Sequence, residues 1–412
     1  MTELRKDAEK IVAACIRAVR PDEAVKRALK SMERPAGRVV IVAAGKAAWQ
    51  MAKAASEVLE CDAGIVITKY DHVMGDIPGI KCFEAGHPVP DDNGFRATET
   101  ALKLVSGLTK DDLVIFLLSG GGSALFELPL ISGDELKDIT AQMLACGADI
   151  VEMNTVRKRL SAVKGGRFAL RCSPAKVFSI VLSDIIGDPL DMIASGPAYP
   201  DSSTCEQALE VVKRYDLKLL EDALGLLETE TPKELDNVTT VVTGSVRELC
   251  RAAEGECRAL GYKTVFLTDR LDCEASEAGR FLGAVARSHA EPGTGRSEAV
   301  AFIAGGETVV HLKGKGLGGR NQELALAAAP LIEGLEAAVF AFGSDGTDGP
   351  TDAAGGYVDG DTMRLLREAG VDINEALSDN DAYHALKNSG GLIITGPTGT
   401  NVNDAYIVLV KY

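Results

Sequence analysis

The sequence lacks the patterns of membrane, disulfide-linked and zinc-binding proteins. No apolar run of about 18 residues occurs in it, so no transmembrane helix is expected. Its nine cysteines form no Cys-x-x-Cys pair and its five histidines no His-Glu-x-x-His motif, which argues against a disulfide framework and a structural zinc site. Segment 1–19 has charges every few residues, which predicts an amphipathic helix rather than a signal peptide. We therefore expect a cytoplasmic protein.

Two catalytic signatures and a basic charge balance are also missing. The sequence has neither the G-x-x-x-x-G-K-[ST] loop of many nucleotide-binding proteins nor the G-x-S-x-G turn of serine hydrolases. Its net charge of −16 argues against nucleic acid and anionic membranes as partners, because both need a basic face. A phosphorylated small molecule needs only a local basic pocket, so such a substrate stays compatible with this charge.

The remaining composition is that of a packed globular chain: 46% of its 412 residues are hydrophobic and 25% charged. Continuous apolar runs alternate with amphipathic helical segments, which indicates mainly parallel sheets flanked by helices and an α/β fold. The strands are expected at 38–45, 111–123, 175–184, 237–245, 262–269, 297–308, 335–346 and 406–412.

A charged, proline-containing segment at 225–237 predicts a domain boundary. We expect a Rossmann-like α/β/α domain over residues 1–233 and a second α/β domain over 234–412.

Glycine is the residue in excess, with 43 of 412 positions, about 10% against a usual ~7%. The glycines gather in loops after predicted strands, where ligands bind in open α/β sheets. The loop of Ser119, Gly120, Gly121, Gly122 and Ser123 can present backbone N–H groups to a phosphate, although a tight turn would also use glycine. A second, basic loop comprises Lys164, Gly165, Gly166 and Arg167, and its alternative is a helix C-cap.

Two cations stand where helices are predicted to begin, Lys46 after the first strand and Arg320, with Asn321, after a glycine-rich loop. A cation at a helix N-terminus costs roughly 0.3–1 kcal/mol, and a bound anion would reverse the sign. A lysine that turns into solvent would explain Lys46 alone. Two such conflicts beside glycine loops favour a bound anion.

Acidic side chains follow several strands. Asp184 and Asp188, and Asp345 in the glycine-rich loop 343–352, are candidate Mg²⁺ ligands, although Asp184 and Asp188 could equally cap the next helix. Segment 395–404, which contains Asn401, resembles that loop and is expected to join the same site. Glycine amides, cations and acidic ligands together are the requirements of phosphoryl transfer.

The stretch GKGLGG at 314–319 suggests a different enzyme, because it matches the dinucleotide fingerprint G-x-G-x-x-G. An NAD(P)H-dependent hydroxypyruvate reductase is therefore the alternative. However, the preceding segment 308–314 is only half apolar, and Asp345 lies 31 residues beyond Gly314 where about 20 are expected for a ribose-binding acid. A non-enzymatic regulator that binds sugar phosphates or nucleotides is a third alternative.

As a set, these loops resemble the class II glycerate kinase family, whose C-terminal part is the MOFRL domain. The matching stretches extend over about residues 43–404 and include AAGKAAWQMA, LLSGGGSALFELP, VKGGRFA, VLSDIIGDPLDMIASGP, GGETVV, GKGLGGRNQELALAAA, GSDGTDGPTDAAGG and TGPTGTNVND. The resemblance implies phosphorylation of D-glycerate by ATP with Mg²⁺, giving 2-phosphoglycerate. It also implies two α/β domains with the active site in the cleft between them.

The resemblance implies that Lys46 and Arg320 are essential. We accordingly expect ATP phosphates at Ser119–Ser123 with Lys164 and Arg167, and Asp345 as the acid that orients the attacking hydroxyl. The expected glycerate-binding residues are Lys46, Arg320, Asn321, Glu307 and Asn401, and the expected metal ligands are Asp184, Asp188 and Asp345. The expected partners are D-glycerate and ATP, and a homodimer is the oligomer we consider.

Overall fold

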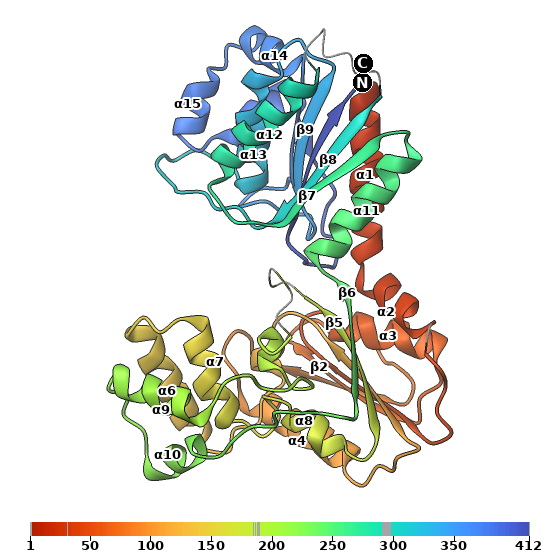
Figure 1. Ribbon diagram of the computed structural model, residues 1–412, viewed down its shortest axis with the longest axis vertical. Helices are drawn as coiled ribbons and strands as arrows, with labels where there is room; N and C mark the ends of the chain where they lie inside the picture. Colours follow the sequence, from red (N-terminus) through yellow and green to blue (C-terminus); the bar gives the residue numbers. More distant parts are fainter. Residues whose placement is uncertain are drawn as a thin grey trace. The chain divides into compact units, whose positions relative to one another are not determined.

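The computed structural model describes residues 2–30, 32–183, 185, 187, 190–290 and 298–411. It divides into two compact units. The first unit comprises Pro21–Ser183 and Asp188–Thr243, and the second comprises Met1–Arg20, Asp184–Gly187 and Gly244–Tyr412. Each unit is built on one six-stranded sheet, and the α/β class predicted from the sequence is confirmed (Figure 1).

The sheet of the first unit has the strand order β3-β2-β1-β4-β5-β6, and the pairs from β3 to β5 are parallel. Its strands are β1 (Val39–Ala44), β2 (Ala63–Lys69), β3 (Ile80–Ala85), β4 (Leu113–Leu118), β5 (Lys176–Leu182) and β6 (Val238–Gly244). The chain continues from β1 to β2 and β3 on one side, and then returns to β4 on the other side. The loops after β1 and β4 therefore meet at a switch point, where open α/β sheets bind ligands.

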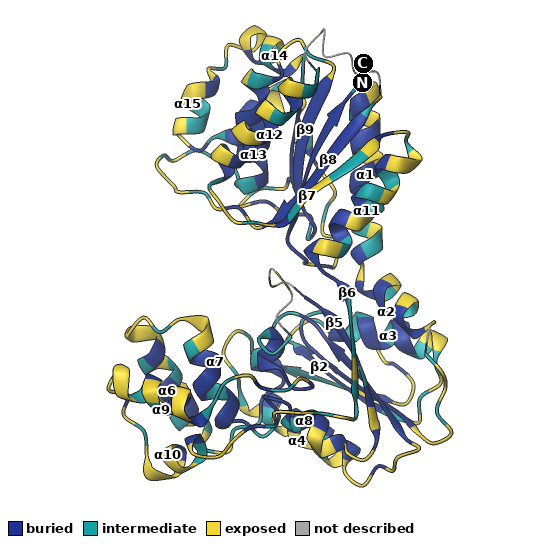
Figure 2. Cartoon of the chain, viewed as in Figure 1, coloured by how far each residue is buried: buried dark blue, intermediate teal, exposed yellow. Residues whose placement is uncertain are grey.

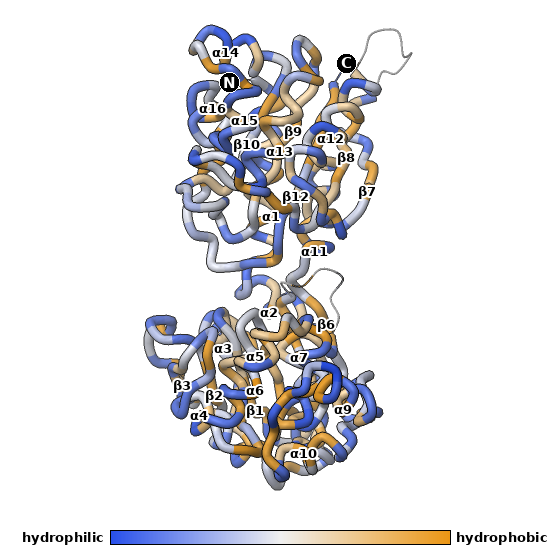
Figure 3. Tube along the Cα trace, turned by 90° about the vertical axis from the view of Figure 1, so that its left-hand side faces the viewer, coloured by the Kyte–Doolittle hydropathy of each residue, from blue (hydrophilic) through white to orange (hydrophobic). Residues whose placement is uncertain are grey.

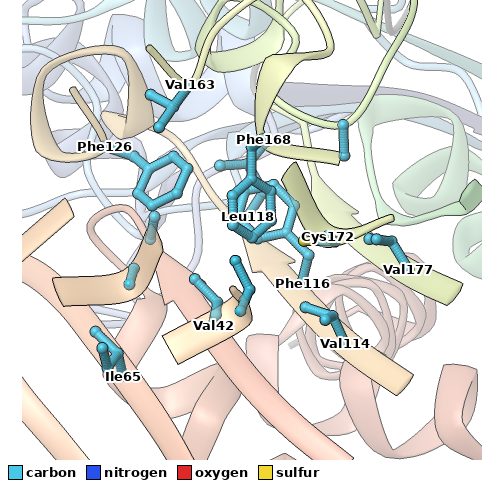
Figure 4. Packing of buried hydrophobic residues seen from close by; sticks show 14 of the residues in the cluster. Val42, Ile65, Val114, Phe116, Leu118, Phe126, Val163, Phe168, Cys172 and Val177 are labelled. Carbon is cyan, nitrogen blue, oxygen red and sulfur yellow. The ribbon is translucent and has the colours of Figure 1, made fainter. Parts of the chain in front are cut away.

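Helices cover both faces of this sheet: α2 (Pro21–Leu29) and α3 (Ala48–Val58) pack on one face, and α4 (Asp92–Val105), α5 (Gly122–Leu125) and α8 (Arg167–Cys172) on the other. The helices α6 (Gly133–Ala145), α7 (Ile150–Arg159), α9 (Cys205–Arg214) and α10 (Glu221–Leu227) pack on one another around a separate core, and a 3₁₀ turn lies at Ile193–Ser195. On the second of these faces the rings of Phe116, Phe126 and Phe168 pack with centroids 4.6–5.5 Å apart (Figure 4). Every residue of β4 is buried, as its continuous apolar sequence predicts.

The sheet of the second unit has the order β11-β10-β9-β12-β8-β7. Its strands are β7 (Lys263–Leu271), β8 (Val300–Gly306), β9 (Ala337–Gly343), β10 (Gly355–Asp359), β11 (Leu392–Ile393) and β12 (Asp404–Val410). Strands β7 and β8 are parallel, whereas β12 lies antiparallel between β8 and β9. Strands β8 and β9 therefore run in the same direction, and both end beside the first residue of β12.

Helices cover both faces of the second sheet as well. α1 (Glu3–Val19) and α11 (Val246–Ala259) pack on one face, and α12 (Ala275–Ala290) and α13 (Arg320–Ala328) on the other. The 3₁₀ turn at Ala329–Leu331 and the helices α14 (Thr362–Glu368), α15 (Ile373–Ser378) and α16 (Ala382–Ser389) complete the unit. The central strands of both sheets are buried along their length, whereas β7 has exposed positions (Figure 2).

The observed units differ from the predicted domains 1–233 and 234–412 at both ends. Helix α1 belongs to the second unit because its buried residues, among them Ile11 and Cys15, pack against α11. Strand β6 belongs to the first unit because it lies at the edge of the first sheet beside β5. The charged segment 225–237 is a connection within the first unit, where the Thr231 hydroxyl donates to Asp201.

The apolar stretches of the chain coincide largely with the strands (Figure 3). Across the part of the chain that the structure describes, no helix combines the length and the apolarity needed to span a membrane.

Candidate functional site

Lys46 lies in the loop between β1 and α3. Its backbone N–H donates to the carbonyl of Gly120 at 2.8 Å, and the Ala47 N–H donates to the Ser119 hydroxyl at 3.0 Å. These bonds join the loops after β1 and β4 at the switch point of the first sheet. Ala47 is the N-cap of α3, so Lys46 precedes the helix rather than opening it.

The side chain of Lys46 extends along the glycine loop. Gly121 has a left-handed backbone with φ of +85°, and a Cβ there would lie 3.2 Å from Lys46 Cγ and 3.0 Å from the His87 ring. Among the described residues, the N–H groups of Gly120 and Gly121 and the Lys46 ammonium have no hydrogen-bond or ion-pair partner. Unpaired amides beside the side chain of a lysine that has no ion pair offer a site for an anion.

In the second basic loop, residues 164–167, the glycine amides are already hydrogen-bonded within the protein. The N–H groups of Gly165 and Gly166 donate to the carbonyls of Ser195 and Gly196 at 2.9 and 2.7 Å. Lys164 is fully buried, which lowers its pKa, and its ammonium lies 3.1 Å from Glu127 and donates to the Ser123 carbonyl at 2.8 Å.

The guanidinium of Arg167 donates to the carbonyls of Arg159 and Ser161 at 3.0 and 2.6 Å. These bonds of Arg167 use only its Nη1 atom, so its phosphate contact stays a prediction. The predicted phosphate contact of Lys164 needs correction, because its buried ammonium already faces Glu127 and the Ser123 carbonyl. Lys164 instead supports the glycine loop through the Ser123 carbonyl.

Of the three predicted metal ligands, the structure describes only Asp345. Asp184 and Asp188 lie outside the described residues. Asp345 is half-buried in the loop after β9, and one of its carboxylate oxygens accepts from the Thr347 N–H at 2.9 Å. Within the described ranges, no group of three or more His, Cys, Asp or Glu side chains is arranged to hold a metal ion.

Arg320 is the first residue of α13, as predicted. Its guanidinium binds both oxygens of Asp404 at 2.6 and 3.0 Å and one oxygen of Glu307 at 2.8 Å. Burial lowers the pKa of Arg320, but the hydrogen bonds and charges of Asp404 and Glu307 outweigh this and raise it. The guanidinium therefore stays charged.

Asp404 is a site residue that the sequence analysis did not single out. It is the first residue of β12 and stands opposite Gly306 of β8 and Gly343 of β9. Burial raises the pKa of Asp404 to about 6, although the bonds from Arg320 oppose the shift. The only sequence signal was its place at the end of segment 395–404, because its partners come from distant parts of the chain.

The N-terminus of α13 is capped by Asp348, which is buried. Its two carboxylate oxygens accept from the backbone N–H groups of Asn321 at 3.1 Å and Gln322 at 2.9 Å. Asn321 is itself buried and its side-chain amide lies 3.3 Å from Asp348. The prediction that Asn321 contacts substrate is therefore corrected to a supporting role.

A pocket of about 670 Å³ opens beside these residues in the second unit. Arg320 and Asp345 line it together with Glu323, Asn380 and part of the glycine loop 314–319. Glu307 reaches the site through its bond to Arg320. Asn401 does not line the pocket; it is exposed, and its side-chain oxygen lies 3.4 Å from the Asn403 N–H.

The glycine loop 314–319 does not have the geometry of a dinucleotide site. Gly314 lies eight residues beyond the end of β8, and segment 308–314 forms no strand. The backbone N–H groups of residues 313–317 donate to Asp379, Asn380 and Asp381. A Cβ at Gly314 would lie 2.3 Å from the Asp379 backbone, so this glycine is needed for packing.

Two family models match the chain. One, described as Domain of unknown function (DUF4147), covers residues 7–228, and the other, the MOFRL family, covers residues 300–404. The D-glycerate 2-kinase of Thermotoga maritima is 52% identical over 99% of this chain and 98% of its own length.

The glycerate 2-kinase of Pyrococcus horikoshii is 40% identical over the same shares of the two chains, 99% and 98%. A protein of Agrobacterium vitis named putative hydroxypyruvate reductase is 39% identical over 92% of this chain and 88% of its own length. The crystal structure of a Thermotoga maritima glycerate kinase superposes with a TM-score of 0.92, at 51% identity over 99% of both chains.

Proposed function

We propose that this chain, which belongs to the glycerate 2-kinase family with a MOFRL domain, transfers the γ-phosphoryl group of ATP to the 2-hydroxyl of D-glycerate. The observation that carries the proposal is the anion site of the first unit. There the Lys46 side chain passes Gly121 at the switch point of a parallel sheet, and its ammonium and the N–H groups of Gly120 and Gly121 have no partner among the described residues.

In the proposed reaction a glycerate oxygen attacks the γ-phosphorus. The new O–P bond forms while the bond to the bridging oxygen of ADP breaks, and the hydroxyl proton leaves to a base. Lys46 and the two glycine amides neutralise phosphate charge. Asp345, which has one carboxylate oxygen unbound among the described residues, orients the hydroxyl. Arg320 uses three of its five N–H donors on Asp404 and Glu307, so the remaining two can hold a glycerate carboxylate.

Mg²⁺ bound with ATP would neutralise the charge that builds up between the β- and γ-phosphates. Asp345 fits such an ion, because Mg²⁺ is usually held by one or two carboxylates together with substrate phosphates and water. A cage made by the protein alone is not found among the described residues.

The alternative of an NAD(P)H-dependent reductase is disfavoured by the loop 314–319. A dinucleotide site needs free amide groups directly after a strand, and the amides of residues 313–317 are used by the turn at 379–381. The cytoplasmic location and the homodimer stay predictions.

Two assays separate the candidate reactions. With D-glycerate and ATP we expect ADP release, and with hydroxypyruvate and NADH no loss of nicotinamide absorbance. Phosphorus NMR of the product is expected to show 2-phosphoglycerate, and 3-phosphoglycerate would contradict the assigned hydroxyl.

Lys46→Ala and Arg320→Ala are each expected to lower kcat by about a thousandfold or more, since the first removes a cation from the transferring phosphoryl group and the second removes the cation that positions glycerate. The matched controls are Lys53→Ala and Arg364→Ala, which remove exposed helical cations paired only with nearby surface acids. Loss of Arg320 leaves buried Asp404 unpaired, so the double variant Arg320→Ala/Asp404→Asn shows whether inactivity persists once that charge is removed. Near wild-type kcat in either cation variant would refute its role.

A further inference from the structure

The pocket of the second unit has an apolar wall and a buried polar floor. Val309, Val310, Leu312 and Pro350 line its wall, and Leu312 is 82% exposed. On the floor lies the Glu323 carboxylate, on a side chain that is only 5% exposed. Apolar side chains together with a few polar groups are the usual lining of a small-molecule pocket.

The polar floor offers a hydrogen-bond acceptor. Asn380 donates from its side-chain nitrogen to Glu323 Oε2 at 3.1 Å, and its oxygen accepts from the N–H groups of Lys313 and Gly314. Those two bonds fix the orientation of the amide. Among the described residues, Glu323 Oε1 has no hydrogen-bond partner. A ligand that binds here can therefore donate a hydrogen bond to this oxygen.

The electrostatic surroundings of Glu323 also favour a ligand that donates a hydrogen bond. Burial raises the pKa of Glu323 and the charge of Glu274 adds to the shift, while the bond from Asn380 opposes it. The raised pKa marks a negative charge that the protein compensates incompletely. A donor from a ligand would supply the missing compensation.

D-Glycerate held by Arg320 and Asp345 would not fill this pocket, because a volume of about 670 Å³ is several times that of so small an acid. It also does not match the part of the lining around Glu323: all three of its carbons carry polar oxygen, and Glu323 would repel its negative charge.

The amides of residues 313–317 are bonded to the turn at 379–381, which leaves those of Gly318 and Gly319, beside Arg320, as the unpaired amides of the lining loop among the described residues. The apolar wall and Glu323 offer nothing to a phosphate.

A purine base matches both features. Its flat faces are apolar enough for the valine, leucine and proline side chains, and its exocyclic amino group is a donor for a buried carboxylate. We propose that this pocket binds the adenine base of ATP and that Glu323 accepts a hydrogen bond from the adenine amino group. The inference rests on the proposed function only in taking ATP as the nucleotide.

The test compares ATP with ITP, which has a carbonyl oxygen in place of the amino group. The wild-type protein is expected to show a KM for ITP at least about tenfold above that for ATP, because ITP leaves Glu323 facing an acceptor. In Glu323→Gln the amide can donate to that oxygen, so the ratio of the two KM values should fall by about tenfold or more. The KM for D-glycerate should not change. Glu375→Gln, at an exposed position on α15, is the matched control.

Titration calorimetry with ADP and IDP on the full chain measures the same preference without turnover. A preference for ADP that Glu323→Gln weakens or reverses, in a protein that does not phosphorylate glycerate, would support the pocket and reject the proposed function. An unchanged ATP-to-ITP ratio, or a raised KM for D-glycerate alone, would overturn the pocket assignment, and so would a wild-type preference for GTP over ATP.

A second variant covers the case in which Glu323→Gln does not fold. Leu312→Asp changes a side chain that is 82% exposed, so the fold does not depend on it. It should raise the KM for ATP severalfold and leave the KM for D-glycerate unchanged. The opposite pattern, or no effect on ATP, would overturn the proposal.

Discussion

Gly121 has a φ of +85°, a left-handed conformation that costs other residues roughly 1–2 kcal/mol. Gly107 has a φ of +78° in the loop after α4. A Cβ at Gly107 would meet nothing within 4 Å, whereas one at Gly121 would press on the His87 ring and on Lys46. Both glycines therefore have a left-handed backbone, but only Gly121 has side chains close to the position of an added Cβ.

Gly121→Ala should lower kcat/KM by about ten- to a hundredfold, because a shift of roughly 1 Å in a group that positions the substrate has effects of that size. Gly107→Ala should lose a similar amount of stability in urea unfolding and keep its activity. Equal kcat/KM in the two variants would mean that the loop at Gly121 does not contact the reacting groups.

Arg320 shows how the surroundings of one residue change the meaning of a sequence pattern. A cation at the start of α13 predicts a bound anion, because the helix dipole disfavours it. In the fold, Asp404 and Glu307 bind the guanidinium and Asp348 caps the helix N–H groups. Acidic side chains of the protein thus offset the unfavourable interaction between Arg320 and the helix dipole. A bound anion is therefore better supported at Lys46 than at Arg320.

At the scale of elements, Asp112 joins β4 to β1. Its carboxylate accepts from the backbone N–H groups of Thr109 and Arg38, both at 2.7 Å, and its side chain is buried. These bonds hold the pKa of Asp112 well below its usual value, with the bond from Thr109 as the largest cause. The ionised form is therefore favoured by folding.

Because the folded pKa is depressed, the contribution of Asp112 is complete above the unfolded value of about 3.9 and is lost as the pH falls below it. Asp112→Asn should lower the free energy of unfolding by about 1–3 kcal/mol at pH 7, and by less at pH 3. Urea unfolding at both pH values measures the difference. Asp111→Asn, at the exposed neighbouring position, should change stability by less than about 0.5 kcal/mol at either pH. A pH-independent loss in Asp112→Asn would contradict the assignment.

The strands and the main helices could be predicted from the sequence, since apolar periodicity and glycine turns are local features. The direction of β12 could not, because antiparallel insertion between β8 and β9 depends on pairing between segments separated by about 60 to 110 residues. That insertion places Asp404 beside Arg320. The sequence therefore predicted Arg320 as a site residue but not its partner Asp404.

At the scale of the whole molecule, the bounds of the two units predict which fragment of the chain folds when it is produced alone. A fragment of residues 21–243 keeps β6 in the first sheet and omits α1, whose apolar face packs on the second unit. A fragment of residues 1–233 lacks β6 and keeps α1 without its partners. We expect 21–243 to unfold cooperatively in urea at a higher midpoint than 1–233. Circular dichroism measures both midpoints, and an equal or lower midpoint for 21–243 would reject the observed division.

The sequence by itself determined the α/β class, the positions of the strands and the glycine loops that follow them, and it led to the family through stretches of contiguous residues. Only the tertiary structure decided which glycine loop keeps unpaired N–H groups. Among the described residues, the amides of Gly120 and Gly121 have no partner, whereas those of Gly165 and Gly166 donate to the carbonyls of Ser195 and Gly196. In loop 314–319 the amides of residues 314–317 donate to the turn at 379–381, and only those of Gly318 and Gly319 stay unpaired in the described part of the chain. Hydrogen bonds between distant segments depend on how the chain folds, so composition and spacing cannot show which donors remain for a ligand.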